Sequence, residues 1–90
     1  MKGLLGRKEL CAGDGLLLRP ASSIHTLFMR FPIDAVFLDR ELVVRRVVPA
    51  LKPARLAFER RSHSVLELAA GECERRGVAA GDRLALSEPV

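Results

Sequence analysis

The chain has 90 residues, of which 49% are hydrophobic, and a formal net charge of +4. This length fits one domain spanning residues 1–90, and because tryptophan and tyrosine are absent, leucine, valine and alanine must fill most of its core. No apolar run reaches the roughly 18 residues that span a bilayer, and the charged first ten residues do not resemble a secretory signal. The composition therefore predicts a cytoplasmic globular protein.

The elements expected in the first half of the chain are mostly strands. Residues 2–10 are predicted to form a short helical turn weakened by two glycines, and residues 11–15 a loop. Strands are predicted at residues 16–19 and 24–31, each ended by a proline. Residues 34–39 and 41–51 flank Asp39 and Arg40, and this pattern predicts an antiparallel hairpin.

The second half adds one helix. Residues 52–61 contain a proline and many charges, which indicates a loop or an irregular edge, and residues 62–68 form another strand-like run. Residues 69–77 predict a short helix with Gly77 as its C-terminal cap, and residues 78–88 predict a turn and a final strand. The expected fold class is therefore mainly β: a small single-domain antiparallel sandwich or barrel with one or two short helices.

Three segments in order resemble a known family. They are "GLLGR", "HTLFMRFPIDAVFLD" and "VLELAAGECERRGVAAGDRLAL", and they are similar to bacterial and archaeal proteins grouped as domain of unknown function 192, or DUF192. The family's motifs match residues 3–7, 28–29, 32–34, 66–67 with 71, and 81–82, whereas "FMRF" stands where the family often has Trp-Met-Lys-Asn. The resemblance implies a compact β fold with a shortened N-terminal arm and assigns no activity.

The stretch "SIHTLFMRFPIDAVFLD" contains most of the candidate site residues. Pro32 must interrupt the strand ladder, and turns on a rigid sheet often carry binding groups, so a site is expected at the Pro32 end of this stretch, close to Arg30 and Asp34. The candidate ligand-binding residues are His25, Arg30, Asp34 and Glu67. Asp34 is the most informative, because a charge in an apolar strand must be paired or hydrogen-bonded. It either accepts backbone N–H groups in the turn after Pro32, which is the favoured role, or lines a pocket near His25.

No cofactor, metal or catalytic residue is predicted. The sequence lacks a phosphate loop, a dinucleotide fingerprint, zinc-ligand spacing and the elbow of a serine nucleophile. His25 and Met29 would share a strand face but lie about 13 Å apart, too far to bind one ion. Cys11 and Cys73 are expected to be two reduced thiols without a disulfide.

Two functions remain open at this point. The first is a non-catalytic binding or accessory module with a protein or small-molecule partner, using a pocket near His25 and Asp34 or a basic face. Nucleic acid is the less favoured partner because the only aromatic residues are phenylalanines. The alternative is a small hydrolase-like or carbohydrate-acting enzyme, in which Asp34 and Glu67 would form an acid/base pair within about 5 to 10 Å.

Overall fold

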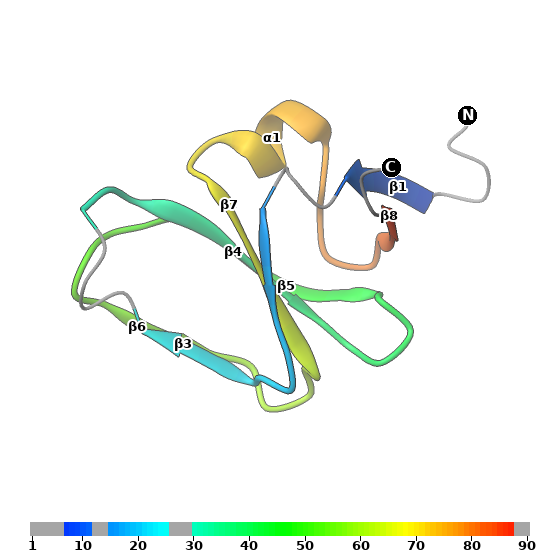
Figure 1. Cartoon of the computed structure of the whole chain (residues 1–90), viewed down its shortest axis with the longest axis horizontal. Helices are drawn as coiled ribbons and strands as arrows, with labels where there is room; N and C mark the ends of the chain where they lie inside the picture. The colour runs from blue at the N-terminus through cyan, green and yellow to red at the C-terminus, as the bar shows by residue number, and fades with distance from the viewer. Residues whose placement is uncertain (1–6, 12–14, 26–29, 88–90) are drawn as a thin grey trace.

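The computed structural model describes residues 7–11, 15–25 and 30–87. They form eight strands and one short helix, shown in Figure 1. In chain order the elements are β1 (Arg7–Cys11), β2 (Leu16–Leu18), β3 (Ser23–His25), β4 (Ile33–Leu38), β5 (Val44–Leu51), β6 (Leu56–Phe58), β7 (Ser64–Ala69), α1 (Glu72–Arg76) and β8 (Arg83–Ser87). The mainly β class with one short helix is confirmed.

A four-stranded antiparallel sheet organises the molecule. Its strand order is β2-β7-β4-β5, so β4 and β7 occupy the centre and β2 and β5 the edges. All six residues of β4 are buried, which fits the apolar run "IDAVFL" of a strand that is covered on both faces. The sheet is open, as are the two-stranded pairs β3-β6 and β1-β8, so the expected sandwich or barrel is not closed into a barrel.

Each face of the central sheet packs against a different core. Because side chains alternate along a strand, Val36 and Leu38 join one cluster with residues of α1 and β8, whereas Ala35 and Phe37 join a second cluster with Ile24 and residues of β5, β6 and β7. In Figure 1, the β3-β6 pair accordingly lies on one side of the central sheet and α1 on the other. We call these the β3-β6 side and the α1 side.

The predicted hairpin at Asp39 is confirmed, with β4 paired antiparallel to β5. The Asp39 carboxylate shapes the turn, because its Oδ1 accepts the backbone N–H groups of Glu41 at 2.9 Å and Val43 at 3.0 Å. Leu42 follows with φ 65°, and its N–H donates to the Asp39 carbonyl. The turn is therefore longer than the two residues Asp39 and Arg40, and its side-chain hydrogen bonds are those of an Asx turn.

Two elements differ from the sequence prediction. Arg7–Cys11, expected in a helical turn, forms β1 and pairs in parallel with β8 along all five residues. A segment with weak helix propensity gains more from a complete ladder with a distant strand than from an isolated turn. Leu56–Phe58, expected in a loop or an irregular edge, forms β6 and pairs antiparallel with β3.

The strand predicted over residues 24–31 and the helix predicted over 69–77 are both present, each over a shorter range. The strand predicted over residues 24–31 is present as Ser23–His25, while residues 26–29, including Met29, lie outside the described part, as does most of the loop predicted over 11–15. The helix predicted over 69–77 is α1, with Gly77 at φ 70° as its C-terminal cap. In the part of the chain that the structure describes, no helix is long and apolar enough to cross a membrane.

The turn between β5 and β6 offers a test of backbone strain. Ala54 follows Pro53, is exposed and has φ 63°, a conformation that suits glycine better than alanine. Ala54→Gly should raise the free energy of unfolding by about 0.5 kcal/mol in urea denaturation, because relief of strain exceeds the added entropy of the unfolded chain. Ala80→Gly, at an exposed alanine without positive φ, should lower it by about 0.5–1 kcal/mol. Destabilisation of equal size by both substitutions would contradict the strain at Ala54.

Candidate functional site

Asp34 is a buried candidate site residue, with only 1% of its surface exposed. It is the second residue of β4, and alternation along the strand directs its side chain to the α1 side with Val36 and Leu38. A charged carboxylate in such a place requires strong hydrogen bonds, because isolated burial of a charge is costly. The structure supplies these bonds from two distant parts of the chain.

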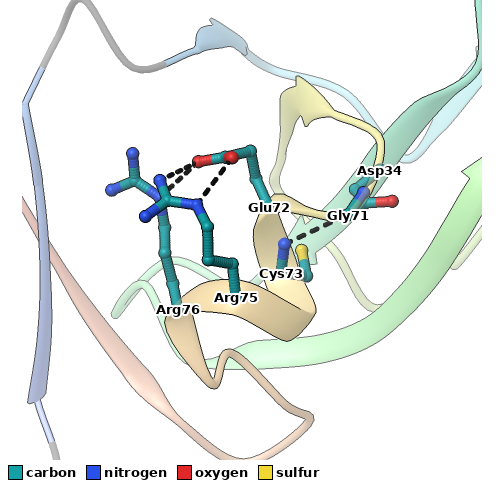
Figure 2. A network of polar contacts seen from close by, with 6 residues as sticks. All are labelled: Asp34, Gly71, Glu72, Cys73, Arg75 and Arg76. Carbon is teal, nitrogen blue, oxygen red and sulfur yellow. Dashed lines mark hydrogen bonds and ion pairs between the residues drawn. The ribbon is translucent and has the colours of Figure 1, made fainter.

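Three backbone N–H groups donate to the Asp34 carboxylate. Oδ1 accepts the N–H of Ala50 at 2.8 Å, and Oδ2 accepts those of Gly71 at 3.0 Å and Cys73 at 2.9 Å. Figure 2 shows Asp34 facing the beginning of α1, with the bond from Cys73 drawn. These donors lie 16, 37 and 39 residues away in sequence, so one side chain joins β4 to β5 and to the helix.

The bond from Ala50 is a consequence of a bulge in β5. Ile33 pairs with Leu51 and Ala35 with Val48, so the segment of β5 opposite Asp34 contains one extra residue. Ala50 lies in this bulge with φ 51°. Its N–H is bonded to the Asp34 carboxylate, which takes the place that a strand carbonyl would have in a regular ladder.

The bonds from Gly71 and Cys73 hold the start of α1. Helices begin with backbone N–H groups that have no partner in the helix, and a local side chain commonly accepts one of them. The residue before α1 is Gly71, at φ 93°, which has no side chain for this purpose. Asp34 therefore caps the helix from another strand, and its negative charge is favourable near the helix N-terminus. A helix of five residues would not be stable without such tertiary support.

Cys73 lies directly beside this carboxylate. Burial, together with the charge of Asp34 and a hydrogen bond to Asp34, raises the pKa of its thiol to about 12. The thiol is free and buried, which makes it a packed apolar group and not a nucleophile. The side chain of Cys11 lies outside the described part, so the absence of a disulfide stays a prediction for that residue.

Glu72 organises the basic end of the same helix. Its carboxylate accepts the Nε–H groups of Arg75 and Arg76, both at 2.9 Å, as Figure 2 shows. The hydrogen bonds of the two guanidinium groups lower the pKa of Glu72 to about 2. These are the i,i+3 and i,i+4 pairs of a helix surface. Arg75 and Arg76 therefore belong to a pairing network within α1.

Glu67 does not share a site with Asp34. It lies in β7 directly opposite Ala35 and Leu16, so its side chain points to the β3-β6 side, whereas Asp34 points to the α1 side. Partial burial raises the pKa of Glu67. Two carboxylates on opposite faces of a sheet, one of them fully engaged by backbone N–H groups, do not form the acid/base pair that the enzymatic alternative requires.

The other two candidates, Arg30 and His25, lie before β4 and at the end of β3. Arg30 is exposed in the bend that precedes β4, and His25 ends β3, where its backbone pairs with Leu56. The side chain of His25 is outside the described part. Among the residues that are described, no group of three or more His, Cys, Asp or Glu residues is arranged to hold a metal ion.

An exposed apolar surface lies on β6 and was not predicted from the sequence. Leu56 is 67% and Phe58 61% exposed, whereas Ala57 between them is buried in the core of the β3-β6 side. Strand alternation puts both large side chains on one face, which we call the β6 outer face. The signal was present in the pattern "LAF", but the surrounding charges favoured a loop.

A family comparison agrees with this architecture. The model of DUF192, a family described as uncharacterized ACR, matches residues 1–86. The chain belongs to the DUF192 family. No curated protein matches the chain.

A solved structure is similar to this DUF192 protein in fold. It is the crystal structure of a protein of unknown function from Novosphingobium aromaticivorans, at 20% identity and a TM-score of 0.69. The similarity covers 77% of this chain and 54% of the other, so the chain spans about half the length of that relative. At this identity the likeness concerns the fold alone.

The role of Asp34 can be measured by substitution. Asp34→Asn should lower the free energy of unfolding by about 2–4 kcal/mol in urea denaturation, because the amide loses the charge and turns an NH2 group toward N–H donors. Glu74→Gln, an exposed carboxylate on the same helix, should change it by less than about 0.5 kcal/mol. Equal stability of the two variants would contradict a structural role for Asp34.

Proposed function

We propose that this DUF192 protein is a non-catalytic binding module that contacts its partner through the β6 outer face. The observation that supports this is the exposure of Leu56 and Phe58 side by side on one strand face. Scattered single apolar residues on a surface are ordinary, but neighbouring large ones are typical of interaction sites. A phenylalanine in such a patch is a common source of binding energy at interfaces.

The residues that pack beneath the β6 outer face hold it in a fixed position. Ala57 and Ile24, which pair across β6 and β3, are both buried beneath it. Arg46 of β5 donates from Nη1 to the Phe58 carbonyl at 2.7 Å and so joins β6 to the central sheet. A surface that is already ordered loses less entropy on binding.

The candidate site residues that were predicted from the sequence do not form the proposed binding surface. Asp34 contributes stability and not ligand contacts, since its carboxylate is engaged by three backbone N–H groups on the α1 side. His25 pairs through its backbone with Leu56, and Arg30 precedes β4 as an exposed cation. The carboxylate chemistry of the enzymatic alternative finds no support in the positions of Asp34 and Glu67.

A selection from a random peptide display library tests the proposal. The wild-type protein should enrich peptides whose binding falls at least about tenfold in the double variant Leu56→Thr/Phe58→Thr, which removes apolar contact while keeping strand propensity. Leu16→Thr is the matched control, because Leu16 is also an exposed apolar strand residue, on β2. Its binding should equal that of the wild type. Peptides that bind wild type and double variant equally, or no enriched peptides at all, would overturn the proposal.

A further inference from the structure

The positive charge of the chain is concentrated around β6. Residues 45–61 contain six basic residues and one acidic residue, whereas the rest of the chain contains nine basic and ten acidic residues. The net charge of +4 therefore comes entirely from the segment that includes most of β5, the following turn and β6. Such a concentration creates a local positive potential and favours an anionic partner.

Several of these cations border the β6 outer face. Arg55 directly precedes Leu56, Arg60 follows Phe58 by two residues, and Arg46 contacts the Phe58 carbonyl at 2.7 Å. All three arginines are exposed. Cations are thus present before the apolar pair, after it and on the side of β5.

Arg45 and Arg61, two further arginines of the segment, each form an ion pair with a carboxylate. Arg45, at a register shift between β4 and β5, forms an ion pair with Asp39 at 3.7 Å. Arg61 pairs with Glu59 at 3.1 Å, and its backbone and side-chain hydrogen bonds lower the pKa of that carboxyl. Glu59 is the single carboxylate of the segment, so the border of the β6 outer face remains positive.

We propose that the β6 outer face binds an extended, acidic peptide segment of a partner protein; this rests on the proposed function and specifies its ligand. Alternate apolar side chains of the peptide cover Leu56 and Phe58, and its carboxylates pair with Arg46, Arg55 and Arg60. The spacing of the peptide side chains matches that of Leu56 and Phe58, because residues i and i+2 lie about 6.8 Å apart in any extended chain. Arginine also matches carboxylates with two parallel hydrogen bonds.

A peptide is favoured over an anionic lipid surface by the size of the apolar area. Interfacial membrane binding depends on a broad apolar face that enters the boundary between headgroups and acyl chains. The β6 outer face presents two large apolar side chains, Leu56 and Phe58, on a strand of three residues. Two anchors of this kind suffice for a peptide, whose remaining affinity comes from charged contacts at the border.

Fluorescence anisotropy with three synthetic peptides tests this inference. The peptides, each about ten residues long, alternate leucine with glutamate, glutamine or lysine and are otherwise identical. The glutamate peptide should bind at least about tenfold more tightly than the glutamine peptide, the lysine peptide should not bind, and high salt should remove the difference. Leu56→Thr/Phe58→Thr should abolish binding of the glutamate peptide.

A matched pair of charge variants tests whether the glutamate peptide binds at the β6 outer face. Arg60→Gln should weaken binding of the glutamate peptide about tenfold, whereas Arg83→Gln, which removes one charge from exposed Arg83 in β8, should have little effect. Equal effects of the two variants would show a non-specific charge attraction and overturn the inference.

The remaining outcomes separate the inference from the proposed function. If the glutamate and glutamine peptides bind equally and both lose affinity in the double variant, the acidic specificity is wrong and the binding surface stands. If no peptide binds in a manner that depends on Leu56 and Phe58, both are wrong. Binding to phosphatidylglycerol vesicles that is lost in the double variant, with no peptide binding, would replace the peptide by a lipid surface.

Discussion

The carboxylate of Asp34 is the interaction on which the arrangement of the α1 side depends. It draws together three segments that are distant in sequence, because its two oxygens accept N–H groups from the bulge in β5, from Gly71 and from the first turn of α1. Removal of a charge from water costs several kcal/mol, and only an enclosing set of charge-assisted hydrogen bonds offsets this cost. No buried side-chain nitrogen or oxygen of the described residues lacks a hydrogen-bond partner.

The side chain of Asp34 lies on one of the two faces of the central sheet, and these faces have different roles. Every second residue of this strand faces α1, and the residues between them face the β3-β6 side. The α1 side is thereby devoted to packing around a polar anchor, with Cys73 and Leu68 in the same core. The β3-β6 side carries a two-stranded layer whose inner residues are buried and whose outer residues Leu56 and Phe58 are exposed. The proposed binding surface therefore lies on the side that Asp34 does not face.

The features that the sequence predicted are those governed by neighbouring residues. The hairpin follows from Asp39, which bonds to the backbone two and four residues later, and the end of α1 follows from Gly77 with its positive φ. The parallel strand β1 was missed because its partner, β8, lies more than seventy residues away in sequence. Strand β6 was predicted only as a loop or an irregular edge because its flanks are charged, whereas its short ladder with β3 decides its conformation.

For the candidate site, the sequence predicted the structural role of Asp34 but not the segments that donate hydrogen bonds to it. A structural role for Asp34 was favoured from its place in an apolar strand, but the expected donors in the turn after Pro32 are not those found. The donors come from β5 and the start of α1, and a bulge or a capping contact between distant segments has no local signature. The separation of Asp34 from Glu67 depends on strand register, which a sequence without cross-strand information does not fix.

The most direct test of the central role of Asp34 is amide hydrogen exchange of the wild-type protein, followed residue by residue by NMR. Backbone N–H groups at the start of a helix normally exchange fast, because they lack intrahelical partners. The structure predicts the opposite for Gly71 and Cys73: their amides, with that of Ala50, should exchange as slowly as those of the central strand β4. Exchange of these three amides at the rate of exposed loop residues would contradict the role assigned to Asp34.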